Sequence, residues 1–196
     1  MPVEEILESH LGLDLRLDGL QARSGDRSRL GEISILGRQV AIDESLDPTV
    51  YPEHEGRYRF TVGHEVGHWE LHRHLVASAG QLSLVAEAAK TSIVCRAGRS
   101  SDPKEWQANQ FSAYLLMPQD LVFQAWRDLQ GNTDPYIAVE EIVDLSARWC
   151  LGEDETPTVG IARKLAQTFG VSGQAMQIRL TGLKLVCISA LAPSLF

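Results

Sequence analysis

Residues 59–68 read RFTVGHEVGH and carry the pattern HExxH, in which His64 and His68 are four positions apart. On an α-helix this spacing puts both side chains on one face, about 6 Å apart along the axis. Two imidazoles in that arrangement can reach one tetrahedral zinc ion. Glu65 is rotated by about 100° from His64, so it can flank a metal ion and act as a general base rather than a ligand. The pattern predicts a helix that carries a metal-dependent centre.

Two glycines lie inside the same predicted helix. The pattern HExxH is short, and chance occurrences on surface helices are common. Gly63 and Gly67 each destabilise a helix by about 1 kcal/mol relative to alanine. A helix that tolerates both glycines indicates that another segment approaches it closely.

Two further histidines are available as a third metal ligand, and neither fits. His72 continues the histidine face, but it lies about 12 Å along the axis from His64, so we expect it to be a partly exposed polar residue. His74 reproduces the metzincin spacing HExxHxxGxxH, in which a glycine breaks the helix before the third histidine. Leu71 occupies that glycine position, so His74 is expected to point away from the metal.

A second predicted helix contains a better third ligand. Asp102 and Pro103 form a favourable helix start. Glu105 falls in the first turn, and Asn109 lies on the same face. Glu105 would complete the His2Glu set of open, gluzincin-like zinc sites, and Asn109 could hydrogen-bond a ligand histidine. A first-turn glutamate also stabilises the helix dipole without binding a metal, so the residues alone leave both interpretations open.

The remaining pattern predicts an α+β fold. Alternating apolar residues near the N-terminus predict strands, and Gly37-Arg38 predicts a tight hairpin turn. We expect a small N-terminal antiparallel sheet packed on a helical zinc-metallopeptidase core at residues 1–135, and a packed, helix-turn-helix-like helical module at 136–196. The expected strands lie at 13–17, 31–36, 39–43 and 185–191, and the expected helices at 3–10, 57–76, 102–116, 119–130, 136–150, 158–169 and 173–182.

Composition fits an ordinary globular protein, with 44% hydrophobic and 22% charged residues. The three cysteines include no CxxC pair, which predicts free thiols in a reducing compartment. The sequence shows neither a secretory signal pattern nor an apolar run of roughly 20 residues. We therefore expect a cytoplasmic protein without a membrane segment, and its net charge of −8 repels nucleic acid at long range.

Two blocks of sequence closely resemble the ImmA/IrrE family of metallopeptidases. Residues 59–68 match the family pattern RFTxxHExGH, and residues 105–118 match ExxANxFAxxLLMP, with Ser112 and Gln110 as mild departures. The resemblance extends more weakly over the N-terminal elements and resumes at residues 165–172. Two separate blocks are far more specific than HExxH alone.

The resemblance implies a site and a substrate class. It implies a Zn²⁺ cofactor held by His64, His68 and Glu105, with Glu65 as the general base. It also implies site-specific cleavage of a helix-turn-helix repressor that controls stress, phage or mobile-element genes. An additional donor to the oxyanion is not determined by the sequence.

The C-terminal part supports an alternative function. Residues 156–196 contain four basic residues and no acidic one, and Gly170-Val171-Ser172 separates two predicted helices as in a helix-turn-helix. Gln174, Gln177 and Arg179 would then face DNA, and the zinc site would be secondary in a DNA-binding regulator. Four basic residues are few beside the roughly 6–10 phosphate contacts of DNA-binding proteins. A packing module or a protein-docking surface is therefore favoured.

Overall fold

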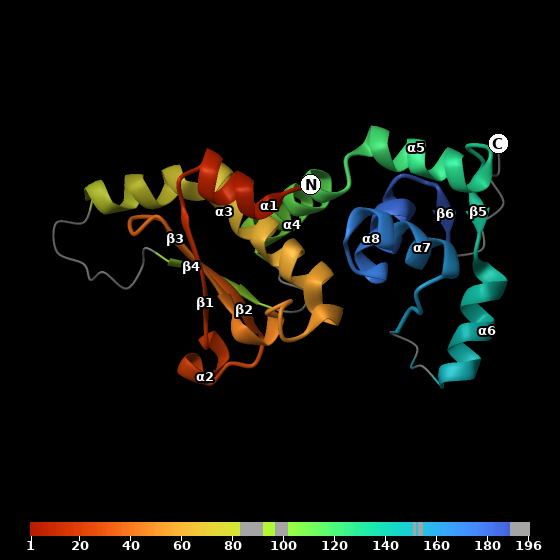
Figure 1. Ribbon diagram of the computed structural model, residues 1–196, viewed down its shortest axis with the longest axis horizontal. Helices are drawn as coiled ribbons and strands as arrows, with labels where there is room; N and C mark the ends of the chain where they lie inside the picture. The colour runs from red at the N-terminus through yellow and green to blue at the C-terminus, as the bar shows by residue number, and fades with distance from the viewer. Residues whose placement is uncertain (83–91, 97–101, 151, 153–154, 189–196) are drawn as a thin grey trace. The chain divides into compact units, whose positions relative to one another are not determined.

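The computed structural model describes residues 1–82, 92–96, 102–150, 152 and 155–188 (Figure 1). The chain divides into two units, Met1–Leu116 and Met117–Phe196. The described elements of the first unit are α1 (Val3–Glu5), η1 (Ile6–His10), β1 (Asp14–Asp18), α2 (Leu20–Ser24), β2 (Arg29–Ser34), β3 (Gln39–Asp43), η2 (Glu44–Leu46), η3 (Pro52–His54), α3 (Glu55–Leu82), β4 (Ser92–Arg96) and α4 (Pro103–Leu116). Those of the second unit are α5 (Gln119–Gln130), β5 (Tyr136–Ile137), α6 (Val139–Trp149), α7 (Gly160–Phe169), α8 (Gly173–Gly182) and β6 (Val186–Cys187).

The sheet of the first unit has the strand order β1-β3-β2-β4. Strands β2 and β3 form the predicted hairpin, and β4 pairs with β2 in antiparallel orientation. β1 runs parallel to β3, with Leu15 opposite Val40. The chain reverses direction at α2 and again at the hairpin turn, so β3 returns in the direction of β1. The α+β prediction is confirmed, whereas the sheet is mixed rather than antiparallel.

One face of the sheet, formed by alternate residues of β2 and β3, packs against α3. Ile33, Val40 and Ile42 are fully buried, on the face that packs against α3. Glu32 and Ser34 point the other way, because successive side chains of a strand alternate between faces. Among the described elements, α3 covers the side of the sheet that carries Ile33, Val40 and Ile42.

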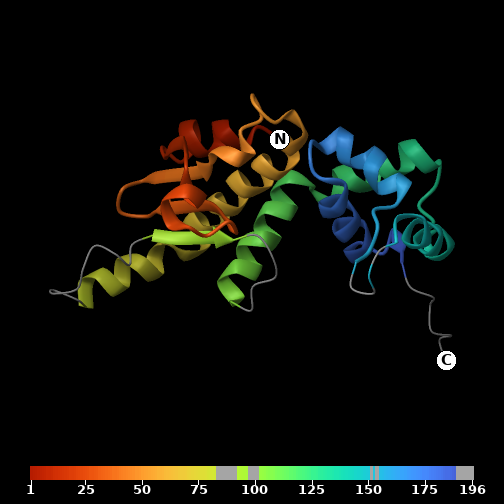
Figure 2. The same ribbon diagram turned by 90° about the horizontal axis from the view of Figure 1, so that it is seen from below.

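Helices α3 and α4 lie side by side in both views of the ribbon (Figures 1 and 2). α3 continues to Leu82, six residues beyond the predicted end at 76. α4 begins at Pro103 as predicted, and the Oδ1 atom of Asp102 accepts a hydrogen bond of 2.9 Å from the backbone N–H of Lys104. The two helices thus place the two sequence blocks that carry the candidate ligands against each other.

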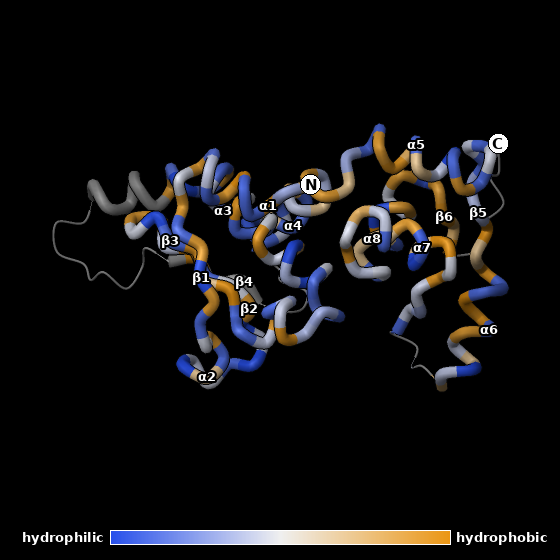
Figure 3. The backbone as a smooth tube through the Cα atoms, viewed as in Figure 1, coloured by the Kyte–Doolittle hydropathy of each residue, from blue (hydrophilic) through white to orange (hydrophobic). Residues whose placement is uncertain are grey.

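The second unit contains amphipathic helices. Hydrophobic and hydrophilic residues alternate along α5 and α6 (Figure 3). α7 and α8 are joined at Gly170, which adopts a left-handed conformation with φ of 60°. The helix expected from residue 136 begins at Val139 instead, because Tyr136 and Ile137 pair with β6 as a short parallel strand. The strand expected at 185–191 is seen at Val186–Cys187, and residues 189–191 lie outside the described part.

The division of the chain falls earlier than the expected boundary after residue 135. Helix α5 belongs to the second unit, which starts at Met117. The assignment of the two parts as a metallopeptidase domain and a docking module stays a prediction. None of the helices, within the described residues, is long and apolar enough to cross a membrane.

Candidate metal centre

The structure brings His64, His68 and Glu105 together, as the sequence predicts. The Nε2 atoms of the two histidines lie 2.9 Å apart, and each lies 3.2 Å from a different oxygen of the Glu105 carboxylate. One ligand atom from each residue falls within 4.8 Å of the others. Both histidines are buried, and the Glu105 side chain is 15% exposed. Three potential ligand atoms therefore converge on one point between α3 and α4.

Asn109 orients His64 in the predicted way. Its Oδ1 atom lies 2.9 Å from the Nδ1 atom of His64. An amide oxygen can only accept a hydrogen bond, so Nδ1 of His64 carries the proton. The lone pair of Nε2 is then available to a metal ion.

His72 differs from its prediction. It is 3% exposed rather than partly exposed, because α4 covers the face of α3 on which it lies. Its ring lies between the Nδ1 atom of His68 and the Oε1 atom of Gln107. His74 is exposed and is not part of the cluster of candidate ligands.

Glu65 lies completely buried next to this cluster. Within the described part of the protein, neither carboxylate oxygen has a hydrogen-bond partner. Burial raises the pKa of Glu65 well above its ordinary value, and the carboxylates of Glu105 and Glu32 raise it further. A buried acid without a protein partner is costly unless a cation or water satisfies it.

The glycines of α3 lie where α4 approaches α3 closely, as the sequence predicts. A Cβ atom at Gly67 would lie 3.1 Å from the Cα atom of Ala108 on α4. A Cβ atom at Gly63 would lie 2.7 Å from the Oγ atom of Ser112, which donates a hydrogen bond of 2.8 Å to the carbonyl of Phe60. The backbones of the two helices can therefore approach closely enough for Glu105 to reach both histidines.

The protonation states suit a divalent cation. Burial lowers the pKa of His68 and outweighs its hydrogen bond with Glu105, which raises that pKa. Burial also opposes ionisation of Glu105, but hydrogen bonds from His64 and His68 outweigh it and lower the pKa of Glu105 to about 2. Metal ligands must be neutral imidazoles and ionised carboxylates, and a bound cation replaces the protons that such groups otherwise share. The residues present therefore fit a zinc ion.

Gly31 and the pair His72 and Gln107 were not predicted to contribute to the centre. A Cβ atom at Gly31, on β2, would lie 2.5 Å from the Oε1 atom of Glu65. A glycine inside a strand indicates close approach of another group, so the sequence did contain that signal. Gln107 stands in an exposed position of α4, and no spacing rule links it to His72.

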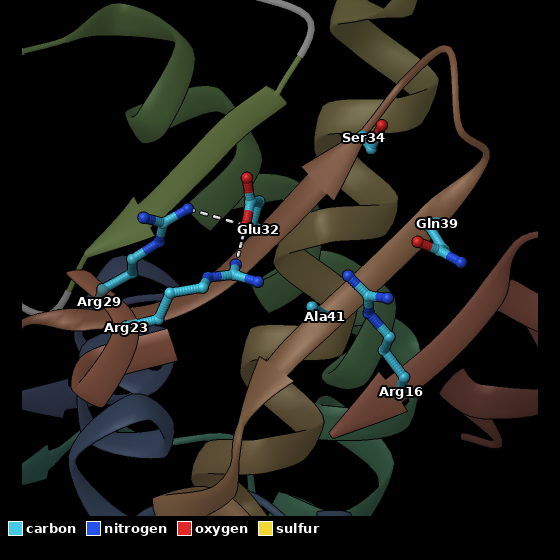
Figure 4. Close-up of a pocket in the computed structure, with 7 residues that line it drawn as sticks. All are labelled: Arg16, Arg23, Arg29, Glu32, Ser34, Gln39 and Ala41. Atoms are coloured by element: carbon cyan, nitrogen blue, oxygen red, sulfur yellow. Dashed lines mark hydrogen bonds and ion pairs between the residues drawn. The ribbon is translucent and has the colours of Figure 1, made fainter. Parts of the chain in front are cut away.

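A polar depression lies on the face of the sheet opposite α3 (Figure 4). Glu32 forms ion pairs of 3.0 Å with Arg23 and 2.7 Å with Arg29. Because Glu32 points away from the face that carries Gly31, the depression is separated from the histidines by the sheet. The residues that line it are Arg16, Arg23, Arg29, Glu32, Ser34, Gln39 and Ala41.

Comparison with known families identifies a peptidase family. The model of the Peptidase M78 family, described as the IrrE N-terminal-like domain, matches residues 19–181. The matched region includes the described parts of α3 and α4 and extends into α8. A comparison with curated proteins found no match.

Proposed function

The chain belongs to the Peptidase M78 family, and on that premise we propose that it is a zinc-dependent endopeptidase in which His64, His68 and Glu105 hold the metal. Family membership supports a peptidase function and a protein substrate. The observation that carries the zinc proposal is the convergence of these three side chains beside the buried Glu65 carboxylate.

Glu65 is proposed as the general base. When bound, the zinc ion supplies Lewis acidity, which lowers the pKa of a water molecule and polarises the scissile carbonyl. The Glu65 carboxylate accepts the proton from the attacking water and returns it to the nitrogen of the leaving amine. Burial raises the pKa of Glu65 above its ordinary value, and a raised pKa makes the carboxylate a stronger base than an exposed glutamate.

The proposed substrate is a helix-turn-helix repressor that controls stress, phage or mobile-element genes. This part of the proposal is supported by the resemblance of residues 59–68 and 105–118 to the ImmA/IrrE pattern. A repressor encoded beside this chain is the first substrate to test.

The contacts of α8 argue against the alternative function, a DNA-binding regulator. Gln177 is buried; its Oε1 accepts a hydrogen bond from the N–H of Val159, and its Nε2 donates one to the carbonyl of Pro157. The Nε atom of Arg179 donates a hydrogen bond of 3.1 Å to the carbonyl of Met117. Two of the three residues expected to face DNA therefore contribute to the packing of their own unit. This favours a packing or protein-docking role for the second unit.

The experiment that tests the function is cleavage of the neighbouring repressor by the zinc-loaded full chain, followed by mass spectrometry. We expect a single cut, and we expect Glu65→Gln to reduce its rate by a factor on the order of 10²–10⁴ with zinc retained. Glu70→Gln is the matched control, since Glu70 is an exposed residue of the same helix. Cleavage by Glu65→Gln at the wild-type rate would show that the mechanism is wrong.

A further inference from the structure

His72 has a defined environment that the proposed function does not use. It is 3% exposed, and its two ring nitrogens face different partners. Its Nδ1 atom lies 3.0 Å from the Nδ1 atom of His68, and its Nε2 atom lies 2.9 Å from the Oε1 atom of Gln107. The contacts therefore form a chain from the exposed residue Gln107 through His72 to His68.

The chemistry of these atoms gives the chain a direction. An amide oxygen can only accept, so the Nε2 atom of His72 must carry a proton and donate it to Gln107. In a neutral imidazole the other nitrogen then has a lone pair, so Nδ1 of His72 accepts the Nδ1–H of His68. With a metal ion in place of the proton that Nε2 of His68 shares with Glu105, 3.2 Å away, the lone pair of that nitrogen would be free to bind the ion.

We propose that Gln107 and His72 are positioning residues that hold His68 in the tautomer and ring orientation needed to bind the metal. The inference rests on the proposed function, because it assumes that His68 is a metal ligand. His64 obtains the same support directly from Asn109, at 2.9 Å. Helix α4 therefore supports both candidate ligands of α3, His64 through a single hydrogen bond and His68 through two.

Substitutions of Gln107 separate this role from simple packing. Gln107→Leu removes the hydrogen-bond acceptor, so the tautomer of His72 with its proton on Nε2 is no longer favoured. Gln107→Glu keeps an acceptor at the same place and is the conservative variant that should rescue the function. Gln107→Lys offers only donors, so it favours a proton on Nδ1 of His72, which then faces the Nδ1–H of His68. Because Gln107 occupies an exposed position, these variants are expected to fold.

The test is the zinc affinity of the full chain, measured by competition with a chromophoric chelator. We expect Gln107→Leu to weaken zinc binding about 10-fold to 100-fold, the usual effect of removing such a supporting group. Gln107→Lys should weaken it further, and Gln107→Glu should bind at least as tightly as wild type. Gln110→Leu, Gln110→Glu and Gln110→Lys, one turn along the same helix, are the matched controls for polarity and charge. Repeating the titrations at 1 M salt screens the charge effects, since the Debye length is then about 3 Å.

A second readout observes the proton itself. In the zinc-loaded chain, nitrogen NMR of the histidines should show His72 protonated at Nε2 and bare at Nδ1. Protonation of His72 at Nδ1, or equal zinc affinity of Gln107→Leu and Gln110→Leu, would overturn the inference while leaving the zinc site intact. A wild-type chain that binds no zinc would overturn the inference and the proposed function together.

Discussion

Gly31 on β2 and Glu65 on α3 lie so close together that a Cβ atom at Gly31 would be 2.5 Å from the Oε1 atom of Glu65. The same atom would lie 2.9 Å from the Cγ2 atom of Thr61. Any side chain at this strand position would therefore displace the proposed general base, the helix or both. β2 forms the wall against which the Glu65 carboxylate is held.

The first prediction concerns Gly31→Ala. The added methyl group should shift Glu65 and lower kcat/KM at least about tenfold, since small displacements of a catalytic group have large effects. Overpacking should also destabilise the first unit by about 1–3 kcal/mol. Peptide cleavage and urea unfolding measure the two effects. Gly19→Ala is the control, because its Cβ would meet other atoms only at 3.8 Å or more; equal activity of the two variants would contradict the prediction.

The second prediction concerns the stability of Glu65→Gln without metal. A carboxyl group whose pKa is raised by folding stabilises the fold below its ordinary value of 4.5, and that contribution is lost as the pH rises through the folded pKa. The amide variant avoids this loss. We expect its melting temperature to exceed that of wild type by a few degrees at pH 8, corresponding to at least about 1 kcal/mol. The difference should shrink toward pH 4, and a constant difference in a thermal scan at both pH values would refute the explanation.

The third prediction separates Glu105 from His74 as the third ligand. Glu105→Ala should weaken zinc binding by several orders of magnitude, because it removes one of three ligands that converge on one point. His74→Ala should bind zinc like wild type, since His74 is exposed and lies outside the cluster. Isothermal titration with zinc distinguishes the two variants. Strong zinc binding by Glu105→Ala would require a different ligand.

The fourth prediction follows from the lowered pKa of Glu105 in the metal-free chain. Its folded pKa of about 2 lies below the ordinary value of 4.5, so its contribution to stability is present above pH 4.5 and lost as the pH falls toward 2. Wild type should therefore be more stable than Glu105→Gln at pH 6, and the two should converge as the pH falls through this window. Urea midpoints at several pH values test the convergence. A gap that widens on acidification would contradict the assigned direction of the shift.

The fifth prediction addresses the contact between Gly63 and Ser112. Gly63→Ala should push Ser112 away from the carbonyl of Phe60 and destabilise the first unit by about 1–3 kcal/mol. Ser112→Ala should cost about 1 kcal/mol for the lost hydrogen bond. Because the two residues are in contact, the double variant should be less destabilised than the sum of the single variants. Additive free energies of unfolding would show that the two helices adjust without this contact.

The parts of the site that follow periodic rules could be predicted from the sequence. The four-residue spacing of His64 and His68, and that of Glu105 and Asn109, defines faces of helices whatever the surrounding structure. The close approach near Gly63 and Gly67 was likewise indicated, because glycines in a helix interior need a compensating reason.

Other features depend on contacts between distant segments. β1 could pair with either edge of the hairpin formed by β2 and β3. The alternation of residues along β1 does not show which edge it joins, so its parallel pairing with β3 could not be predicted. His72 was predicted to be partly exposed because its distance from His64 excludes it as a ligand, but burial depends on α4. Tyr136 and Ile137 are not helical as predicted, because they pair with Val186 and Cys187 in a strand about fifty residues away.

Gly31 on β2 and Gly63 and Gly67 on α3 are positions where an added Cβ atom would meet a neighbouring atom at 3.1 Å or less. For protein engineering, these contacts divide α4 into a side that packs against α3 and an exposed side. The side that contains Ala108 is buried against α3, so larger side chains there are expected to destabilise the first unit by overpacking. Lys104 and Trp106 on the same helix are exposed, and new side chains at these positions would change the surface of α4 without separating the two helices.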